Sequence, residues 1–192
     1  MPPNLRWCPT GPFAFLPIHA AGIYHQGTTE SVSDYVVSSY VPTIGALLTA
    51  EPYPTNPFEM MAVIQSQTLP GTELELQKIE AHVPNECLVT LGIPGVPATV
   101  ERVVSQLSSA SIAHFACHGQ QNVGNPLDSA LILEDGRLKV SRIMQQSMPN
   151  ASLAFLCACE TAMGDEKLPD EVIHLGATLL FAGFRGVVAT MW

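Results

Sequence analysis

Apolar runs and amphipathic segments take turns along the chain from residue 58 onward. The runs predicted to be strands are 58–66, 87–92, 111–119, 129–133, 151–161 and 186–192. Because most of these runs lack polar alternation, they are typical of strands that are covered on both faces. An order in which such strands alternate with helices predicts an α/β fold with a mostly parallel central sheet and helices on both faces.

Helical spacing of apolar residues marks the segments between these strands. The predicted helices are 71–84, 96–110, 137–150 and 168–184. We expect Thr72 to cap the first of them and Pro84 to end it. Closer to the N-terminus, we expect strands near 5–8 and 33–42 and a helix that starts after Pro42.

Two of the apolar runs end on chemically reactive residues. "IAHFACHG" (112–119) ends at His118 and Gly119, and "LAFLCACET" (153–161) ends close to Cys159. In a parallel sheet the carboxyl ends of the strands meet at one edge, so His118 and Cys159 are predicted neighbours. A histidine favours the thiolate of a nucleophilic cysteine, and the amides of Gly119 and Cys159 are candidate donors to an oxyanion.

The same residues also allow a purely structural interpretation. In that case Cys159 is a buried thiol at a strand end and His118 is a hydrogen-bonded core histidine. Cys157 shares a strand face with Cys159, and we expect it to pack in the core as its buried neighbour. Cys117 is expected to face the core, and His114 is expected to be packed and hydrogen-bonded.

Metal binding is not expected from the motifs. A zinc site would have to use Cys117, His118, Cys157 and Cys159, but the Cys-x-Cys and Cys-His spacings are tighter than those of common structural zinc sites. The sequence has no Gly-x-Gly-x-x-Gly, Walker or Gly-x-Ser-x-Gly motif, which disfavours nucleotide binding and serine hydrolysis. We therefore expect no metal and no cofactor.

Four further polar residues are candidates for lesser roles. His19 lies near a turn from which it could approach the site, and His174 lies in the last predicted helix. Asp128 and Ser129 precede a predicted strand, where a role in a turn is expected ahead of one in a substrate cleft. We assign no chemistry to these four residues.

Composition narrows the classes of function. Of the 192 residues 47% are hydrophobic and 13% are charged, and the net charge is −9 with only 8 Lys and Arg. A surface that binds nucleic-acid phosphates is therefore not expected. The sequence shows neither a membrane-spanning apolar run nor a signal peptide, and its five cysteines have no regular spacing. Together these features predict a cytoplasmic protein with free thiols and no contact with membranes.

Several segments, taken in order, resemble a known family. "HFACHG", "SALILEDGRLKVSRI", "LAFLCACETAMGD" and "EVIHLGATLLFAGFRGVVATMW" are similar to the CHAT domain, a caspase-like cysteine peptidase domain related to separases. "WCPTGPFAFLPIHAAG" and "SDYVVSSYVPTIGALL" resemble its N-terminal half in the form found in fungal proteins.

The resemblance implies a caspase-like three-layer sandwich and a cysteine endopeptidase that cleaves a protein or peptide. It also implies that His118 and Cys159 form a catalytic dyad that acts through a thioester. Family members usually continue past the last strand with an acidic loop and a helix, so we expect residues 1–192 to be a single CHAT domain without its C-terminal end. Tetratricopeptide repeats or regulatory proteins are the expected partners, and a catalytically silent module for protein interaction and signalling is the alternative.

Overall fold

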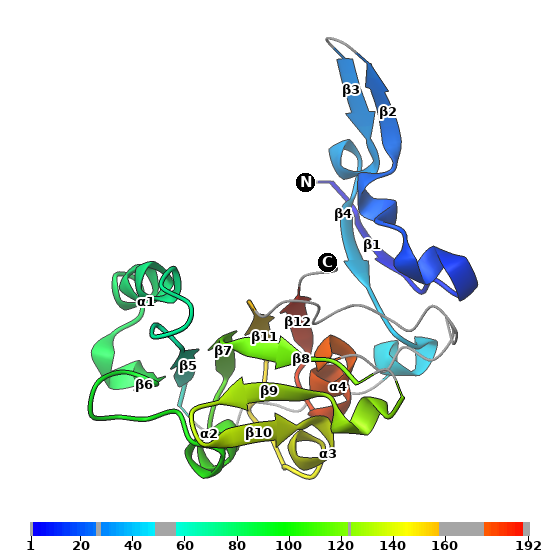
Figure 1. Cartoon of the computed structure of the whole chain (residues 1–192). Coiled ribbons are helices and arrows are strands. Elements are labelled where there is room, and N and C mark those ends of the chain that lie inside the picture. The colour runs from blue at the N-terminus through cyan, green and yellow to red at the C-terminus, as the bar shows by residue number, and fades with distance from the viewer. Residues whose placement is uncertain (1, 26–27, 49–56, 123, 158–174, 190–192) are drawn as a thin grey trace. The chain divides into compact units, whose positions relative to one another are not determined.

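A computed structural model describes residues 2–25, 28–48, 57–122, 124–157 and 175–189 of the chain (Figure 1). These residues form two compact units. The first unit holds the described residues up to 48, and the second holds those from 57 onward. His114, His118 and Cys157 all belong to the second unit.

Short strands and 3-10 helices make up the first unit. Its strands are β1 (Asn4–Trp7), β2 (Gly22–His25), β3 (Thr28–Ser31) and β4 (Val37–Tyr40). Its 3-10 helices are η1 (Gly11–Phe15), η2 (Ile18–Ala20), η3 (Val32–Asp34) and η4 (Ile44–Leu47). β1 pairs in parallel with β4, and β2 pairs antiparallel with β3. Pro12 and Pro17 remove backbone donors, which favours short elements in this unit.

The predictions for the first unit are confirmed in part. Strands occur near both predicted positions, as β1 and β4, although β4 covers only part of the segment 33–42. The helix expected after Pro42 is a single 3-10 turn, η4, within the described residues.

The second unit is built around a parallel sheet of five strands. From one edge to the other they are β12 (Gly186–Ala189), β11 (Leu153–Leu156), β7 (Ile112–Ala116), β5 (Met60–Ile64) and β6 (Leu88–Leu91). Every neighbouring pair is parallel. The apolar runs therefore identified the strands of this sheet, and all of β5 is buried.

Helices cover both faces of this sheet (Figure 1). They are α1 (Thr72–Glu80), α2 (Val100–Leu107), α3 (Val140–Ile143) and α4 (Leu175–Ala182). Leu76 and Ile79 of α1 pack against the small cluster on one face that contains Ile64. The buried valines, leucines and isoleucine of α2, α3 and α4 belong to the larger core on the other face. The result is the three-layer, caspase-like α/β sandwich that the sequence predicts.

The split of the helices follows from the handedness of the connections. The chain crosses the sheet in one direction from β5 to β6 and in the opposite direction from β6 to β7. Because crossovers between parallel strands are right-handed, reversing the direction moves the connecting helix to the other face. α1 therefore lies on one face of the sheet, and the helices that follow lie on the other.

The apolar run 111–119 is not one strand, so that prediction is wrong in its detail. β7 ends at Ala116, Cys117 forms a bend, and a separate strand, β8 (His118–Gln120), follows. The bend falls where the parallel partner ends, because Ala116 is paired with Ile64, the last residue of β5. Beyond this position the chain leaves the central sheet.

β8 joins a second, antiparallel sheet. It pairs with β9 (Ala130–Leu133), which pairs in turn with β10 (Gly136–Lys139). The sequence predicted a helix directly after the turn at Asp135–Gly136, but β10 precedes the short helix α3. Lys139 ends β10 and takes the cap position of α3, so strand and helix adjoin without a loop.

The starts of α1 and α2 differ in how they are capped, and the first of them tests the predicted cap at Thr72. Thr72 is the first residue of α1 and Gly71 holds the cap position without a side-chain bond, so the cap prediction is displaced by one residue. The Thr72 hydroxyl instead donates to the carbonyl oxygen of Leu69 at 2.7 Å. In α2 the cap is a true side-chain cap, because Oγ1 of Thr99 accepts from the Arg102 amide at 3.4 Å.

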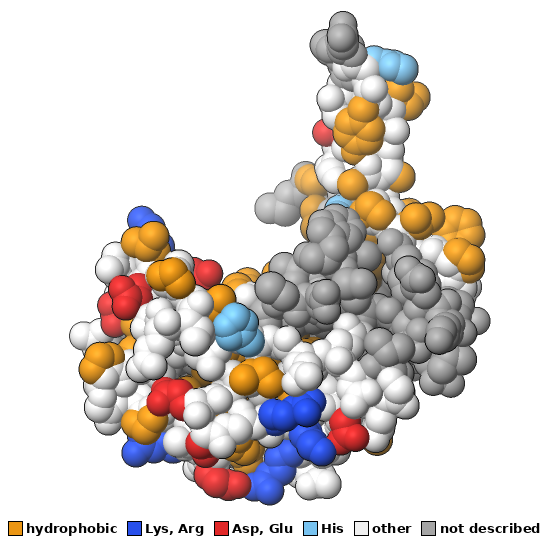
Figure 2. All heavy atoms as spheres, viewed as in Figure 1, with side chains coloured by type: hydrophobic (Ala, Val, Ile, Leu, Met, Phe, Trp, Pro, Cys, Tyr) orange, Lys and Arg blue, Asp and Glu red, His pale blue; other side chains and the backbone are white. Residues whose placement is uncertain are grey.

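Charged side chains of the second unit form local pairs. Figure 2 shows Lys and Arg side chains beside Asp and Glu side chains on this surface. Nζ of Lys139 lies 2.7 Å from an oxygen of Asp128, and Arg142 lies 3.0 Å from an oxygen of Glu101. The Lys139 ammonium, through its hydrogen bond and charge, lowers the pKa of Asp128. Both pairs are open to solvent, so they contribute little to folding stability.

One glycine next to the central sheet offers a direct test of the packing. Gly92 follows β6 with φ +88, and a Cβ atom there would lie 1.8 Å from the carbonyl oxygen of Ile64. Gly95 has φ +84 but has no atom within 4 Å of such a Cβ. Gly95→Ala therefore measures only the free energy that the left-handed conformation costs a residue with a side chain. Gly92→Ala adds to this a clash with the backbone at the end of β5.

We expect Gly95→Ala to lower the free energy of unfolding by about 1–2 kcal/mol. Gly92→Ala should lower it by more than about 3 kcal/mol, because backbone at the strand end must move. Urea unfolding followed by circular dichroism measures both values. Equal losses in the two variants would show that the close approach to Ile64 does not constrain the fold.

Candidate functional site

The strand order of the central sheet reverses between β5 and β7. β6 lies on one side of β5 and β7 on the other, so the connections that leave β5 and β6 run to opposite faces. In open α/β sheets, a crevice for ligands forms at such a point, beyond the carboxyl ends of the strands. Gln65 directly follows β5 and His118 follows β7 after one residue, so both lie at this point.

Two hydrogen bonds hold Gln65 next to the segment that leads into His118. The Gln65 amide donates to the carbonyl oxygen of Ala116 at 3.1 Å. The amide of His118 donates to Oε1 of Gln65 at 3.0 Å. Gln65 is not part of either sequence motif, and its position directly after a buried strand is the one signal that marks it. This side chain fixes the backbone of His118 as the chain turns from β7 into β8.

His118 itself is half-buried, and its ring makes no hydrogen bond to any residue in the described part of the chain. Gly119 follows it in β8 and is held opposite Leu131 of β9. The structural interpretation of His118 as a hydrogen-bonded core histidine gains no support from these described contacts. Among the described residues, no contact of its ring opposes the role in proton transfer that the sequence predicts.

β11 brings the cysteine segment to the same edge. It lies beside β7 in the sheet, with Leu156 paired with Phe115. The amide of Cys157 then donates to the carbonyl oxygen of Phe115 at 3.0 Å. Cys159 follows two positions later and lies outside the described residues. The His118–Cys159 dyad therefore stays a prediction, as does the oxyanion role of the Gly119 and Cys159 amides.

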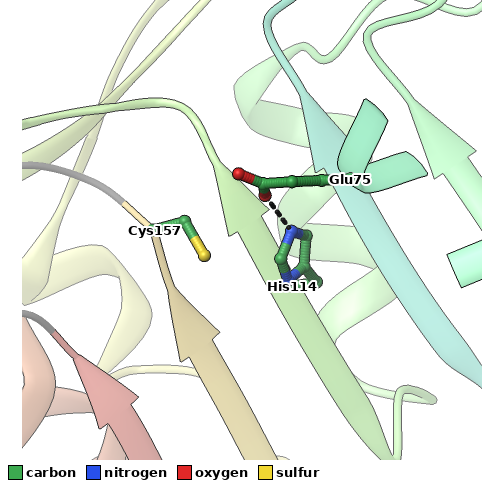
Figure 3. A group of neighbouring side chains, drawn as sticks. All are labelled: Glu75, His114 and Cys157. Atoms are coloured by element: carbon green, nitrogen blue, oxygen red, sulfur yellow. Dashed lines mark hydrogen bonds and ion pairs between the residues drawn. The ribbon is translucent and has the colours of Figure 1, made fainter. Parts of the chain in front are cut away.

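A second group of reactive side chains lies next to this edge (Figure 3). His114 of β7 and Glu75 of α1 form an ion pair with 2.9 Å between Nε2 and Oε2. The sulfur of Cys157 points toward this pair, and the three side chains have donor atoms within 4.8 Å of one another. His114 was expected to be packed and hydrogen-bonded, and this is confirmed because it is only 8% exposed. No motif pointed to Glu75, 39 residues away along the chain, as its partner.

Cys157 does not pack in the core, so the expectation of a buried neighbour is wrong. Its side chain is exposed. It follows Phe155 on the sheet face that carries His114, and on that face α1 packs over β5 rather than over β11. Cys117 is fully buried as predicted, in the larger core on the opposite face.

The two described thiols near the site are both poor thiolates. Burial, followed by the proximity of Cys157, raises the pKa of Cys117 to about 12. Partial burial is also the main reason why the pKa of Cys157 is raised, and the negative charge and hydrogen bond of Glu75 add to the effect. Both cysteines therefore remain protonated at neutral pH.

Three of the four residues assigned lesser roles have hydrogen-bond or ion-pair partners. Nδ1 of His19 lies 2.8 Å from the Tyr40 hydroxyl within the first unit. Ser129 is buried and accepts a hydrogen bond from the Asn122 amide at 2.9 Å, which agrees with a role in a turn. Asp128, described above, pairs with Lys139. His174 lies outside the described residues.

A three-layer sandwich with His-Gly beyond one central strand and a cysteine segment beyond the next defines a class of proteins related to caspase-like cysteine peptidases. Within this class, the CHAT domain family matches residues 2–192. The chain therefore belongs to the CHAT domain family.

The chain is also similar to one curated protein of different description. It is 29% identical over 140 residues to the sn-glycerol-3-phosphate import ATP-binding protein UgpC 2 of Agrobacterium fabrum, a match that covers 71% of this chain and 35% of that protein. The chain thus spans about a third of the length of this relative. Because the sequence lacks a Gly-x-x-x-x-Gly-Lys-Ser/Thr loop, the match gives no ground for assigning ATP binding to this chain.

Among the described helices, none has the length and apolarity required to span a bilayer.

The effect of Glu75 on Cys157 can be tested by alkylation. Glu75→Gln removes a negative charge that opposes the thiolate, so the pKa of Cys157 should fall and its alkylation at pH 8 should become severalfold faster. Mass spectrometry of iodoacetamide-treated protein gives the rate at each cysteine, with exposed Cys8 as an internal reference. Cys117 should stay unmodified in the folded protein.

The matched control is Glu73→Gln, which makes the same charge change on the exposed side of the first turn of α1. This variant should leave the rate at Cys157 unchanged. If both variants accelerate alkylation equally, a general change in charge or in α1 is responsible, and Glu75 does not act on Cys157 directly.

Proposed function

We propose that this CHAT domain is a cysteine endopeptidase whose nucleophile is Cys159. The thiolate of Cys159 attacks the scissile carbonyl carbon, and the amides of Gly119 and Cys159 hold the oxyanion. His118 takes up the thiol proton and gives it to the leaving amine as the thioester forms. Water, deprotonated by His118, then hydrolyses the thioester, which releases the acid product and restores the thiol.

The observation that carries this proposal is the placement of the two chain segments. His118 stands just beyond the carboxyl end of β7, and β11 lies beside β7 and leads into the segment that contains Cys159. Both segments therefore emerge at the edge where α/β sheets place their functional residues. Membership of the CHAT domain family supports the same chemistry.

The described contacts also help to choose among the neighbouring residues. Cys117 is buried with a pKa raised to about 12, and the thiolate of Cys157 is opposed by the Glu75 carboxylate. His114 is occupied by its ion pair with Glu75. Of the residues in the two motifs, these contacts leave Cys159 and His118 as the better candidates for nucleophile and base.

The proposed substrate is a protein or peptide, and no cofactor takes part. Proposed partners are tetratricopeptide-repeat regions or regulatory proteins, which would present the substrate or control access to the dyad. Nucleic acids and membranes are not among the proposed partners. The small number of Lys and Arg residues in this acidic chain supports the exclusion of nucleic acids.

A catalytically silent interaction module is the second candidate. Several large apolar side chains of the first unit are more than half exposed, among them Phe13, Ile23 and Ile44. Exposed apolar side chains of this size favour contacts with other proteins. In this case partner binding would survive the loss of Cys159.

Removal of either proposed catalytic group should abolish hydrolysis. We expect Cys159→Ala and His118→Ala to lower kcat/KM on a peptide library by at least about 10³-fold, because nucleophile and base act as a unit. Cys157→Ser, two positions away and exposed, is the matched control and should retain most of the activity. Wild-type protein that cleaves no peptide, and is not labelled at Cys159 by electrophilic peptide probes, would refute the peptidase and favour the silent module.

Gln65 should act as a positioning residue for His118. Gln65→Ala removes the acceptor that holds the His118 amide, so we expect kcat to fall about 10-fold with little change in KM. Gln65→Glu keeps an acceptor oxygen and should restore most of kcat. A rise in KM with unchanged kcat would assign Gln65 to substrate binding. Equal losses of kcat in the two variants would assign it to stability alone.

A further inference from the structure

We propose that Glu75, His114 and Cys157 form a binding site for a divalent transition metal, with Zn²⁺ as the best-matched ion. The site is separate from the proposed dyad and requires neither Cys159 nor peptide hydrolysis. It uses one carboxylate oxygen, one imidazole nitrogen and one sulfur, drawn from α1, β7 and the residue after β11.

The spacing of the donor atoms is close to that of a tetrahedral metal site. All of them lie within 4.8 Å of one another, and the carboxylate oxygen and ring nitrogen are 2.9 Å apart. A tetrahedral Zn²⁺ with bonds of about 2.0–2.3 Å holds its ligands at separations of about 3.3–3.8 Å. Shifts of about 1 Å or less in these separations bring them into that range: Glu75 exchanges its hydrogen bond with His114 for the metal, and the exposed side chain of Cys157, beyond the end of β11, has room to adjust.

The chemistry of the three ligands selects the ion. Thiolate and imidazole suit Zn²⁺ and other late first-row metals, whereas Mg²⁺ and Ca²⁺ prefer oxygen ligands alone. One thiolate and one carboxylate balance the charge of a divalent ion. Without a metal, the Glu75 carboxylate repels the thiolate form of Cys157. When a metal binds, the thiol releases its proton, and the thiolate and the carboxylate are both stabilised by the cation between them.

The surroundings allow an ion to enter and leave one coordination position open. The side chains of His114 and Glu75 are 10% and 42% exposed, and Cys157 is exposed as well. The site therefore combines a nearly buried imidazole on a central strand with two ligands that solvent can reach. Three protein ligands leave a fourth tetrahedral position for water or another ligand.

The site differs from the zinc set considered from the sequence. That set joined Cys117 and His118 to Cys157 and Cys159, but Cys117 is fully buried in the core of the opposite sheet face. Only Cys157 is shared by the two sets. The partners that the structure gives it, Glu75 and His114, come from segments that the spacing of the cysteines does not reveal.

Titration of the reduced, metal-free chain with Co²⁺ tests the proposal. We expect a single equivalent of Co²⁺ to produce a thiolate-to-metal charge-transfer band that Zn²⁺ abolishes by displacement. Cys157→Ser should remove the band, and Glu75→Gln and His114→Gln should weaken Co²⁺ binding by about 10-fold or more. The matched controls, Glu73→Gln and Cys87→Ser, should bind as the wild type does.

Cys159→Ala separates this site from the proposed peptidase, because it should abolish hydrolysis and keep the band. Circular dichroism reports whether His114→Gln still folds, and Glu75→Gln, on a partly exposed helix face, tests the site independently of it. A band that survives Cys157→Ser, or one that depends on Cys159 but not on Glu75, would overturn the proposal. The absence of any thiolate band in the wild type would overturn it as well.

Discussion

The reversal of strand order between β5 and β7 is the constraint on which the rest of the second unit depends. Because crossovers are right-handed, the reversal sends α1 to one face of the sheet and α2 to the other. The chain leaves the carboxyl end of β5 towards α1 on one face, and it leaves the carboxyl end of β7 towards β8 and then α3 on the other face. Gln65 and His118 meet between these two exits. A fold without this reversal would carry all its helices on one face and would have no such edge.

The same topology places α1 where its carboxylate reaches the central sheet. α1 packs Leu76 and Ile79 over β5, and its side toward β7 carries Glu75. β7, the middle strand of the sheet, presents its middle residue, His114, on that face. A nearly buried histidine requires a polar partner, and the helix supplies one at 2.9 Å. The ion pair is thus a consequence of the direction in which the chain leaves β5.

Much of this architecture could be predicted from the sequence because burial on both faces leaves a strong apolar signal. The strands of the central sheet and the helix α2 were found in this way. β8 was missed as a separate strand because an apolar run does not show where its partner strand ends. β10 was missed because a short strand directly before a helix leaves no loop residues to mark the boundary.

The candidate site was less predictable, since it depends on contacts between distant segments. The motifs identified His118 and the pair of cysteines, but Gln65 and Glu75 lie 53 and 39 residues from the histidines they contact. Alternation along an extended strand suggested that Cys157 packs beneath Cys159. In the structure α1 does not extend over the end of β11, so a position that the pattern marks as interior is exposed.

The two cysteines of Cys157-Ala-Cys159 illustrate how the surroundings of a thiol decide its chemistry. Partial burial, followed by the negative charge of Glu75, raises the pKa of Cys157 and makes this residue a poor nucleophile at neutral pH. The same carboxylate becomes favourable when a cation lies between the two groups, because both then act as anionic ligands. The contact with Glu75 counts against Cys157 as a nucleophile. The same contact favours the proposed metal site. A nucleophile two positions further along the chain requires the opposite environment, with an imidazole in place of the carboxylate, and this is the role that the proposed function gives to His118.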